Sequence, residues 1–225
     1  MLKYIYAIGI AIVLAYGCLQ KDVKPFNLVA HEFITEYARL FPDETPLSID
    51  NPNLTNLHIP EDSILYAVKK FSATYSDELK NYKLSELTPT VQKDYAKMQN
   101  ILKSVDGYAQ NSKNNPTYFN AVYGFQRILN TNYAPAEKRL QILFDKLEKV
   151  PAYYDAAKKQ LAYSNLAHIN ENTDKHLASY DFFKNILPNA IKKQYHMTPQ
   201  YQARLNDAAL AVKDYVAYVE SLKLK

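Results

Sequence analysis

The residue whose chemistry the sequence indicates most directly is Cys18, the single cysteine of the 225-residue chain. It follows Gly17, and before it lie a basic residue near the start and an apolar run, Ile5–Ala15. A basic start, a short apolar stretch and small residues before a cleavage point are typical of a secretory signal peptide. The run is only about half as long as a membrane-spanning helix. The sequence therefore predicts that residues 1–17 form a signal peptide that is removed.

The residues before Cys18 resemble the lipobox of bacterial lipoproteins, in which the cysteine becomes the first residue and is acylated, although Ala15 stands where leucine is usual. We expect a lipid such as palmitate on Cys18. Residues 18–25 would then tether a folded domain to the bacterial outer membrane, facing the periplasm or the cell surface. The alternative is an ordinary secretory signal with an incidental thiol. A lone reactive cysteine is a liability in a secreted protein, which favours the lipid.

A second set of residues could bind a metal ion. His168 and Glu171 lie three positions apart, so that both side chains would point the same way on a helix, and His176 is nearby. However, Asn170 and Asn172 indicate that a helix ends here. We therefore favour polar, solvent-exposed residues over a metal site, and we expect both histidines to be exposed.

Catalytic motifs elsewhere in the chain are incomplete. His31 and Glu32, with Glu36 one turn later, share part of the zinc-peptidase helix pattern, but a threonine stands where the second histidine would be. No Gly-x-Ser-x-Gly nucleophile elbow occurs, and the single cysteine is assigned to the lipid. We expect no catalytic residue and no cofactor, and we interpret His31 as an exposed residue.

The elements that position these residues are expected to be helices. After residue 17 the chain holds only two glycines, Gly107 and Gly124, and no sustained alternation of apolar and polar residues. Apolar residues instead recur three to four positions apart, which is typical of amphipathic helices. The sequence predicts an all-α single domain, residues 26–225, as a bundle or array of about eight helices. Their expected ranges are 26–41, 60–79, 89–105, 117–129, 135–150, 151–166, 173–195 and 199–222.

Prolines suggest how this helical domain is organised. Residues 42–60 hold four of the eleven prolines and are expected to form an irregular loop over the helices. Pro151 marks a bend between two helices, with Leu147 and Leu161 buried at the junction. Pro188 is expected to kink the seventh helix.

Tyrosine is unusually frequent, with 20 residues and no tryptophan. Neighbouring tyrosines such as Tyr153 with Tyr154, or Tyr215 with Tyr218, are expected mainly in the core. Some tyrosines would line a groove for a protein or peptide partner, because tyrosine gives contact area at low entropy cost.

The charge of the mature chain does not indicate nucleic-acid binding. Removing residues 1–17 from 225 leaves 208 residues, and dropping Lys3 from the 27 basic residues leaves 26 against 23 acidic ones, a net charge of +3. The charges form no long block of one sign. The expected partners are the membrane, through the lipid on Cys18, and a protein or peptide.

Several segments resemble the N-terminal helical half of the bacterial domain of unknown function 885, a family related to zinc metallopeptidases. The matching segments are Tyr37-Ala38-Arg39-Leu40-Phe41-Pro42-Asp43, Asn115-Pro116-Thr117-Tyr118, Arg139-Leu140 with Val150-Pro151-Ala152-Tyr153 and Leu161, and the Ala-rich segment 203–222. In the full-length family a second half follows, with a His-Glu pair and a further histidine for zinc. The resemblance implies a non-catalytic helical half, to which no catalytic residue is carried over.

Two hypotheses follow for the function of the chain. The first is a lipid-anchored bacterial envelope lipoprotein, acting as a binding or accessory module without catalysis. The second is an enzyme, either a metal-dependent hydrolase that uses His168, Glu171 and His176 or one subunit of a split zinc peptidase whose partner supplies the zinc half.

Overall fold

The computed structural model describes residues 23–48, 50–161, 165–193 and 196–224, so that Cys18 and the predicted signal peptide lie outside the described residues. Within these ranges the chain contains helices and no strand, which confirms the predicted all-α fold. The α-helices are α2 (Phe26–Leu40), α3 (Asp62–Leu79), α4 (Pro89–Asn111), α5 (Val122–Asn130), α6 (Ala136–Leu147), α7 (Val150–Gln160), α8 (Leu166–Asp181), α9 (Leu187–Lys192) and α10 (Pro199–Ser221). The shorter turns include the 3-10 turns η1 (Pro42–Glu44), η2 (Pro52–Thr55) and η4 (Pro116–Tyr118) and the π-helical turn η5 (Phe182–Ile186).

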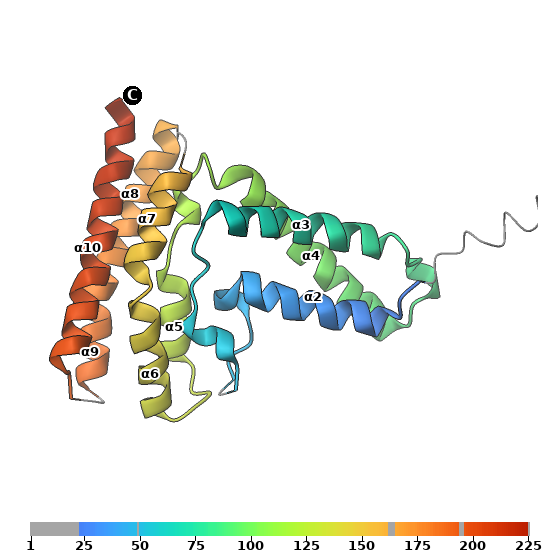
Figure 1. Ribbon diagram of the computed structural model, residues 1–225, viewed down its shortest axis with the longest axis horizontal. Helices are drawn as coiled ribbons and strands as arrows, with labels where there is room; N and C mark the ends of the chain where they lie inside the picture. The colour runs from blue at the N-terminus through green and yellow to red at the C-terminus, as the bar shows by residue number, and fades with distance from the viewer. Residues whose placement is uncertain (1–22, 49, 162–164, 194–195, 225) are drawn as a thin grey trace, which may run out of the picture.

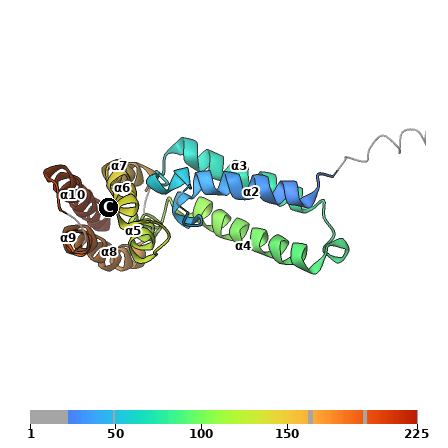
Figure 2. The same cartoon turned by 90° about the horizontal axis from the view of Figure 1, so that it is seen from below.

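The helices form two groups, each with its own hydrophobic core (Figure 1). The N-terminal group is α2, α3 and α4, whose core includes Phe33 and Phe71. The C-terminal group is α5 to α10, whose core includes Phe125 and Tyr215. Figure 2 shows the N-terminal group extending to one side of the C-terminal group. The C-terminal ends of α2 and α4 point toward the C-terminal group, so that the segments after them cross between the two cores.

Capping residues explain two helix starts that the sequence predicts correctly. The hydroxyl of Thr88 accepts a hydrogen bond from the N–H of Val91 (3.5 Å), and that of Thr198 accepts one from the N–H of Tyr201 (3.2 Å). A proline follows each threonine at the first helical position. Both features stabilise a helix N-terminus, because they satisfy or remove N–H groups that have no partner within the helix.

The start of α8 differs from the prediction. Asn170 and Asn172 are expected to separate two helices, but α8 begins at Leu166 and continues through both residues. The side chain of Asn165 caps it by accepting a hydrogen bond from the N–H of His168 (2.8 Å). Asn172 is completely buried. Packing of this helix face therefore outweighs the low intrinsic helix propensity of asparagine.

The C-terminal ends of two helices also differ from the prediction. The third predicted helix was expected to close at Gly107, but α4 continues to Asn111. Gly107 does not have a positive φ, and the next residue, Tyr108, is held by a hydrogen bond to His58. A glycine thus remains inside the helix because tertiary contacts fix the last turn. The helix after the bend, α7, ends at Gln160, short of the predicted range.

The effect of Pro188 takes the form of a π-helical turn. The helix continues from α8 through η5 into α9, and the N–H of Leu187 bonds to the carbonyl oxygen of Phe182, five residues back. Proline lacks an N–H, so one turn of wider hydrogen bonding absorbs the disturbance. With α8, η5 and α9 taken as one helix, the described part of the chain contains the predicted eight helices.

The described residues of the 42–60 loop lie against the C-terminal group, as predicted. Leu54 and Leu57 are buried in the core of that group. The Nζ of Lys149 donates to the carbonyl oxygen of Thr55 (2.8 Å) and to the Oδ1 of Asn56 (2.7 Å). The loop is therefore fixed in place although it has little regular structure.

The junction of α6 and α7 is buried, which confirms the prediction for its two leucines. The exposed fraction is 0% for Leu147 and 2% for Leu161, and Val150 between them is also fully buried. All three belong to the core of the C-terminal group. The two helices on either side of the break before Pro151 therefore pack against one core.

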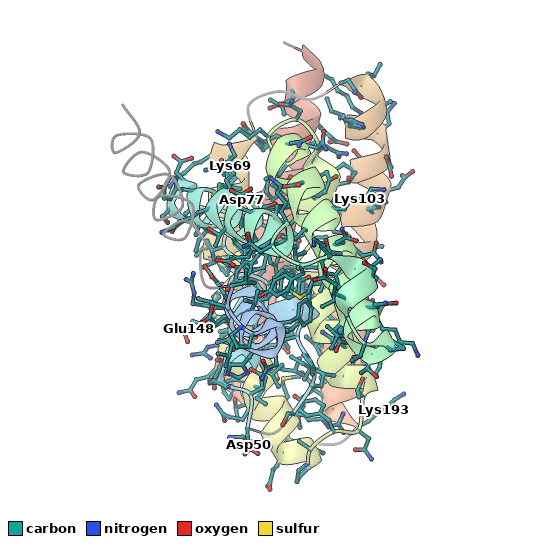
Figure 3. All side chains as sticks on the ribbon, turned by 90° about the vertical axis from the view of Figure 1, so that its right-hand side faces the viewer. Asp50, Lys69, Asp77, Lys103, Glu148 and Lys193 are labelled. Atoms are coloured by element: carbon teal, nitrogen blue, oxygen red, sulfur yellow. The ribbon has the colours of Figure 1, made fainter. Side chains whose placement is uncertain are left out.

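Exposed side chains on the surface include many charged residues. Side chains such as Lys103 and Lys193 point away from the helices into solvent (Figure 3). Of the helices in the described ranges, none combines the length and the apolar character needed to cross a membrane.

Candidate ligand site between the two helix groups

A cavity of about 560 Å³ lies where the N-terminal and C-terminal groups meet. Its lining comes from α2, η1 and α4 and from η4, α5 and α7. Five tyrosines line it: Tyr37, Tyr108, Tyr118, Tyr123 and Tyr153. This volume, and a lining of aromatic and aliphatic side chains with a few polar groups, are usual for small-molecule sites. The cavity is therefore the candidate functional site.

One wall of the cavity is a continuous series of aromatic rings. Phe41 stacks on His58, with ring centroids 4.8 Å apart and planes at 10°. Tyr108 lies edge-on to both, at 5.9 Å from Phe41 and 5.1 Å from His58. Tyr37 contacts Phe41 at 5.1 Å, and Tyr118 contacts Tyr108 at 5.8 Å. The rings come from the end of α2, the 42–60 loop, α4 and η4, so the wall exists only in the folded chain.

His58 holds this wall in place through both ring nitrogens. Burial lowers the pKa of His58 below its usual value, so the ring is neutral at pH 7. Its Nδ1–H then donates to the carbonyl oxygen of Leu40 (2.5 Å), and its Nε2 accepts a hydrogen bond from the hydroxyl of Tyr108 (2.8 Å). Burial also raises the pKa of Tyr108, which keeps this hydroxyl protonated. The pair fixes the rings, and neither nitrogen of His58 is left as a general base.

A buried ion pair joins η1 to α6. The Nζ of Lys146 lies 2.6 Å from the Oδ1 of Asp43, with side-chain exposures of 1% and 21%. The same Nζ donates to the carbonyl oxygen of Asn56. Burial lowers the pKa of Lys146, while the negative charge of Asp43 acts in the opposite direction. The charge on this lysine therefore depends on its aspartate partner.

Gly124 of α5 leaves room for the ion pair. A Cβ at this position would lie 1.9 Å from the Oδ1 of Asp43 and 3.0 Å from the Cε of Lys146. One turn later, Arg127 donates to the carbonyl oxygen of Asp43 and to that of Thr45 (2.9 Å). Helix α5 thus supplies both the space and the hydrogen-bond donors that fix η1 at the cavity.

Glu44 lines the cavity as an exposed residue. Partial burial raises the pKa of this carboxyl, and the positive charge of Arg127 opposes that rise. Burial and the nearby charge of Glu44 raise the pKa of Tyr37 to about 12. The carboxylate of Glu44 therefore acts on the same part of the cavity as the ring of Tyr37.

The structure does not bring the predicted metal candidates together. The Oε1 of Glu171 forms an exposed ion pair with the Nζ of Lys175 (2.6 Å), and the Nδ1 of His168 contacts the carbonyl oxygen of Asn114 (3.4 Å). In the described ranges, no group of three His, Cys, Asp or Glu side chains is arranged to hold a metal ion. Glu171 and His168 therefore each contact a different neighbouring residue.

The expectation that His176 is exposed is wrong. Its exposed fraction is 0%, and burial lowers its pKa. The Nε2 of His176 lies 2.6 Å from the carbonyl oxygen of Phe119, to which the neutral ring donates, and the Nδ1 lies 3.1 Å from that of Asn172. Residue 176 lies on the face of α8 that is turned toward the core, whereas the neighbouring Leu177 is exposed. His176 is a core residue that joins α8 to the segment before α5.

His31 is exposed, as predicted. The two carboxylates near it have other partners: Glu32 pairs with Lys24 (3.0 Å), and Glu36 accepts a hydrogen bond from the hydroxyl of Tyr75 (3.3 Å). These contacts connect α2 to the chain before it and to α3. They explain the polar residues on this helix without a metal.

The tyrosines named from the sequence divide into core and cavity residues. Tyr154 and Tyr215 are completely buried and contact each other with centroids 5.1 Å apart, which confirms core packing for this pair. Tyr153 lines the cavity. Tyr218 is partly buried and donates to the carbonyl oxygen of Leu161 (3.3 Å).

Most cavity residues were not identified from the sequence, among them His58, Asn100 and Tyr108. These residues are far apart in the chain and carry no motif. The sequence did contain one indication of the cavity. Three of the segments that resemble the domain of unknown function 885 contribute lining residues, namely Tyr37, Tyr118 and Tyr153.

The two buried histidines predict how stability depends on pH. The pKa values of His58 and His176 are lowered by burial, whereas an unfolded histidine titrates near pH 6.5. Just below that pH the unfolded chain binds more protons than the folded chain, so acid favours unfolding. The free energy of unfolding should therefore fall as the pH drops below about 6.5.

Urea unfolding at a series of pH values measures this dependence. The variant His176→Gln, although less stable, should show a shallower slope because one titrating group is gone. A stability that stays constant or rises as the pH falls would contradict the buried neutral state of these rings.

Comparison of the sequence with protein-family models and with curated proteins finds no match. Among solved structures, the fold is similar to that of a candidate lipoprotein of unknown function from Shewanella oneidensis, with a TM-score of 0.70 and 22% sequence identity. The similarity covers 88% of this chain and 37% of the other, so this chain spans little more than a third of the length of its structural neighbour. The chain shares its helical fold with part of that larger protein.

Proposed function

We propose that this chain is a lipid-anchored protein of the bacterial envelope that binds a ligand in the cavity between its two helix groups. The observation that carries the binding function is the cavity itself, with five tyrosines around a volume of about 560 Å³. The lipobox-like sequence at Cys18 supports the anchor. The similarity in fold to part of a candidate lipoprotein is consistent with it.

The contacts around the cavity favour binding over catalysis. Both ring nitrogens of His58 are bonded, and the amine of Lys146 is paired with Asp43. These groups fix the cavity walls, and neither is left with a free lone pair for proton transfer. A rigid, pre-formed aromatic cavity suits a binding protein, because little conformational entropy is lost when a ligand enters.

The anchor is tested by replacing Cys18. In a bacterial host grown with labelled palmitate, the wild-type chain should incorporate label and enter the membrane fraction, whereas Cys18→Ala should do neither. The reason is that a free thiol is the acylation site. Retention of label by the variant would overturn this part of the proposal.

The binding function is tested by filling the cavity. Ser104 is an exposed residue of α4 that lines it, so that Ser104→Trp would place a large side chain in the ligand space. The full chain in nonionic detergent would be incubated with a cell metabolite extract and the retained compounds identified by mass spectrometry. Wild type should retain a compound that Ser104→Trp loses. The control Lys97→Trp, on the same helix outside the cavity, should retain it. Equal retention by all three proteins would exclude the cavity as the site.

A further inference from the structure

The two charged side chains that line the cavity are acidic, and two basic side chains, Arg127 and Lys146, lie next to the lining residues Tyr123 and Asp43. The chain carries a net charge of +4, but the charged residues that line the cavity are Asp43 and Glu44, and no lysine or arginine is among them. His58, which also lines it, is neutral at pH 7 because of its burial. Because Lys146 offsets the charge of Asp43, any attraction of the cavity for a cation comes from Glu44.

The two carboxylates differ in what they can offer a ligand. Asp43 is already paired with Lys146 at 2.6 Å. Among the described residues, by contrast, no basic side chain forms an ion pair with Glu44. The nearby guanidinium of Arg127 instead donates to the carbonyl oxygens of Asp43 and Thr45. The charge of Glu44 is therefore available to a ligand.

The aromatic rings favour the same kind of ligand. Tyr37 and Tyr123 line the cavity together with Glu44, and the guanidinium of Arg127 lies 5.7 Å from the centroid of the Tyr123 ring. Tyr108 and Tyr118 contact each other along the aromatic wall. The faces of such rings attract cations through their quadrupole, most strongly where water is excluded.

We propose that the cavity binds an organic cation, in which an ammonium group carrying apolar carbon atoms lies among the tyrosine rings with Glu44 as its counter-ion. This inference rests on the proposed binding function and names the chemical class of its ligand. A bare metal ion fits less well, because only two carboxylates line the cavity and no metal-ligand cluster occurs among the described residues. The neutral polar residues Asn100, Ser104 and Asn120 also line the cavity and can bind the rest of the ligand.

Calorimetric titration of the full chain in nonionic detergent tests this proposal with two matched probes. Choline carries a quaternary ammonium group, and 3,3-dimethylbutan-1-ol has the same shape without the charge. Choline should bind at least about tenfold more tightly, because only the cation interacts with the carboxylate and the ring faces.

A third probe, Nα-acetyl-lysine N-methylamide, presents the side chain of a peptide lysine. Tighter binding of this probe than of choline would indicate a peptide source, and the reverse would indicate a small molecule.

Variants show whether Glu44 is the counter-ion. Glu44→Gln should weaken choline binding about two- to fivefold, the range for an exposed ion pair, and leave the neutral probe unchanged, whereas Glu220→Gln, an exposed residue near the end of α10, should change neither. Equal affinity for the charged and neutral probes, or no effect of Glu44→Gln, would overturn the cation proposal. If the neutral probe still binds and Ser104→Trp abolishes its binding, the cavity remains a ligand site and only its charge preference is wrong. If no probe binds, the cation proposal is wrong, and retention of extract compounds decides the binding function separately.

Discussion

Replacing Leu147 with alanine is expected to destabilise the protein by about 2–5 kcal/mol, the cost of emptying a packed leucine site. Leu147 is completely buried where α6 meets α7, in the core of the C-terminal group. Because both helices are fixed at this junction, neighbouring side chains cannot move freely into the space. Leu161→Ala should fall in the same range, since that leucine is also buried.

Urea unfolding followed by far-ultraviolet circular dichroism measures this effect. The matched control is Leu210→Ala, which removes the same atoms from an exposed position of α10 and should change stability by no more than about 0.5 kcal/mol. In thermal unfolding, each kcal/mol should lower the melting temperature by about 2–4 °C in a chain of this size. Equal effects at positions 147 and 210 would contradict the packing described for the junction.

The two glycines of the described helices should respond in opposite directions to the same substitution. Gly124→Ala is expected to cost on the order of 3 kcal/mol, near the lower end for breaking a buried ion pair. The added Cβ would lie 1.9 Å from the Oδ1 of Asp43, so the carboxylate must leave Lys146 and the buried amine loses its partner. We place the cost at the lower end because the side chain of Asp43 keeps 21% exposure and can turn toward solvent.

Gly107→Ala is the control for this substitution. Gly107 also lies within a helix, but a Cβ there would meet no atom within 4 Å. The substitution should therefore stabilise the protein by about 0.5–1 kcal/mol, because alanine has the higher helix propensity. Differential scanning calorimetry of both variants compares them directly. If Gly124→Ala is as stable as Gly107→Ala, the close contact between α5 and the ion pair does not exist in solution.

The helices were predictable because their signals are local. Thr88 and Thr198, each followed by a proline, mark helix starts in the sequence, and the structure begins α4 and α10 at those points. The buried junction at Leu147 and Leu161 follows from the apolar spacing on either side of Pro151. Such patterns depend only on residues within a few turns of one another.

The helix ends were predicted wrongly where tertiary packing outweighs the low helix propensity of a residue. Asn172 and Gly107 both suggest a helix end, yet both lie inside helices, one buried in the core and the other next to a tyrosine fixed by His58. His176, which was expected to be exposed, likewise lies on the face of α8 that packs into the core. Local propensity is a weak signal when a helix face is covered by another part of the chain.

The cavity could not have been predicted from the sequence, because its walls come from segments far apart in the chain. Glu44, His58 and Tyr108 are ordinary residues in their local contexts, and only the meeting of two helix groups places them around one space. The resemblance to the domain of unknown function 885 did mark three of the segments that line it. That family relationship, and the signal peptide outside the described residues, stay predictions.

The position of the ligand can be observed directly by NMR of the full chain with isotope-labelled tyrosine rings. When the compounds retained from the metabolite extract are added, the signals of the five cavity tyrosines, Tyr37, Tyr108, Tyr118, Tyr123 and Tyr153, should shift. Those of Tyr66, which is exposed on α3 and outside the cavity, should stay in place. Shifts confined to tyrosines outside the cavity, or no shift at all, would contradict a ligand site between the two helix groups.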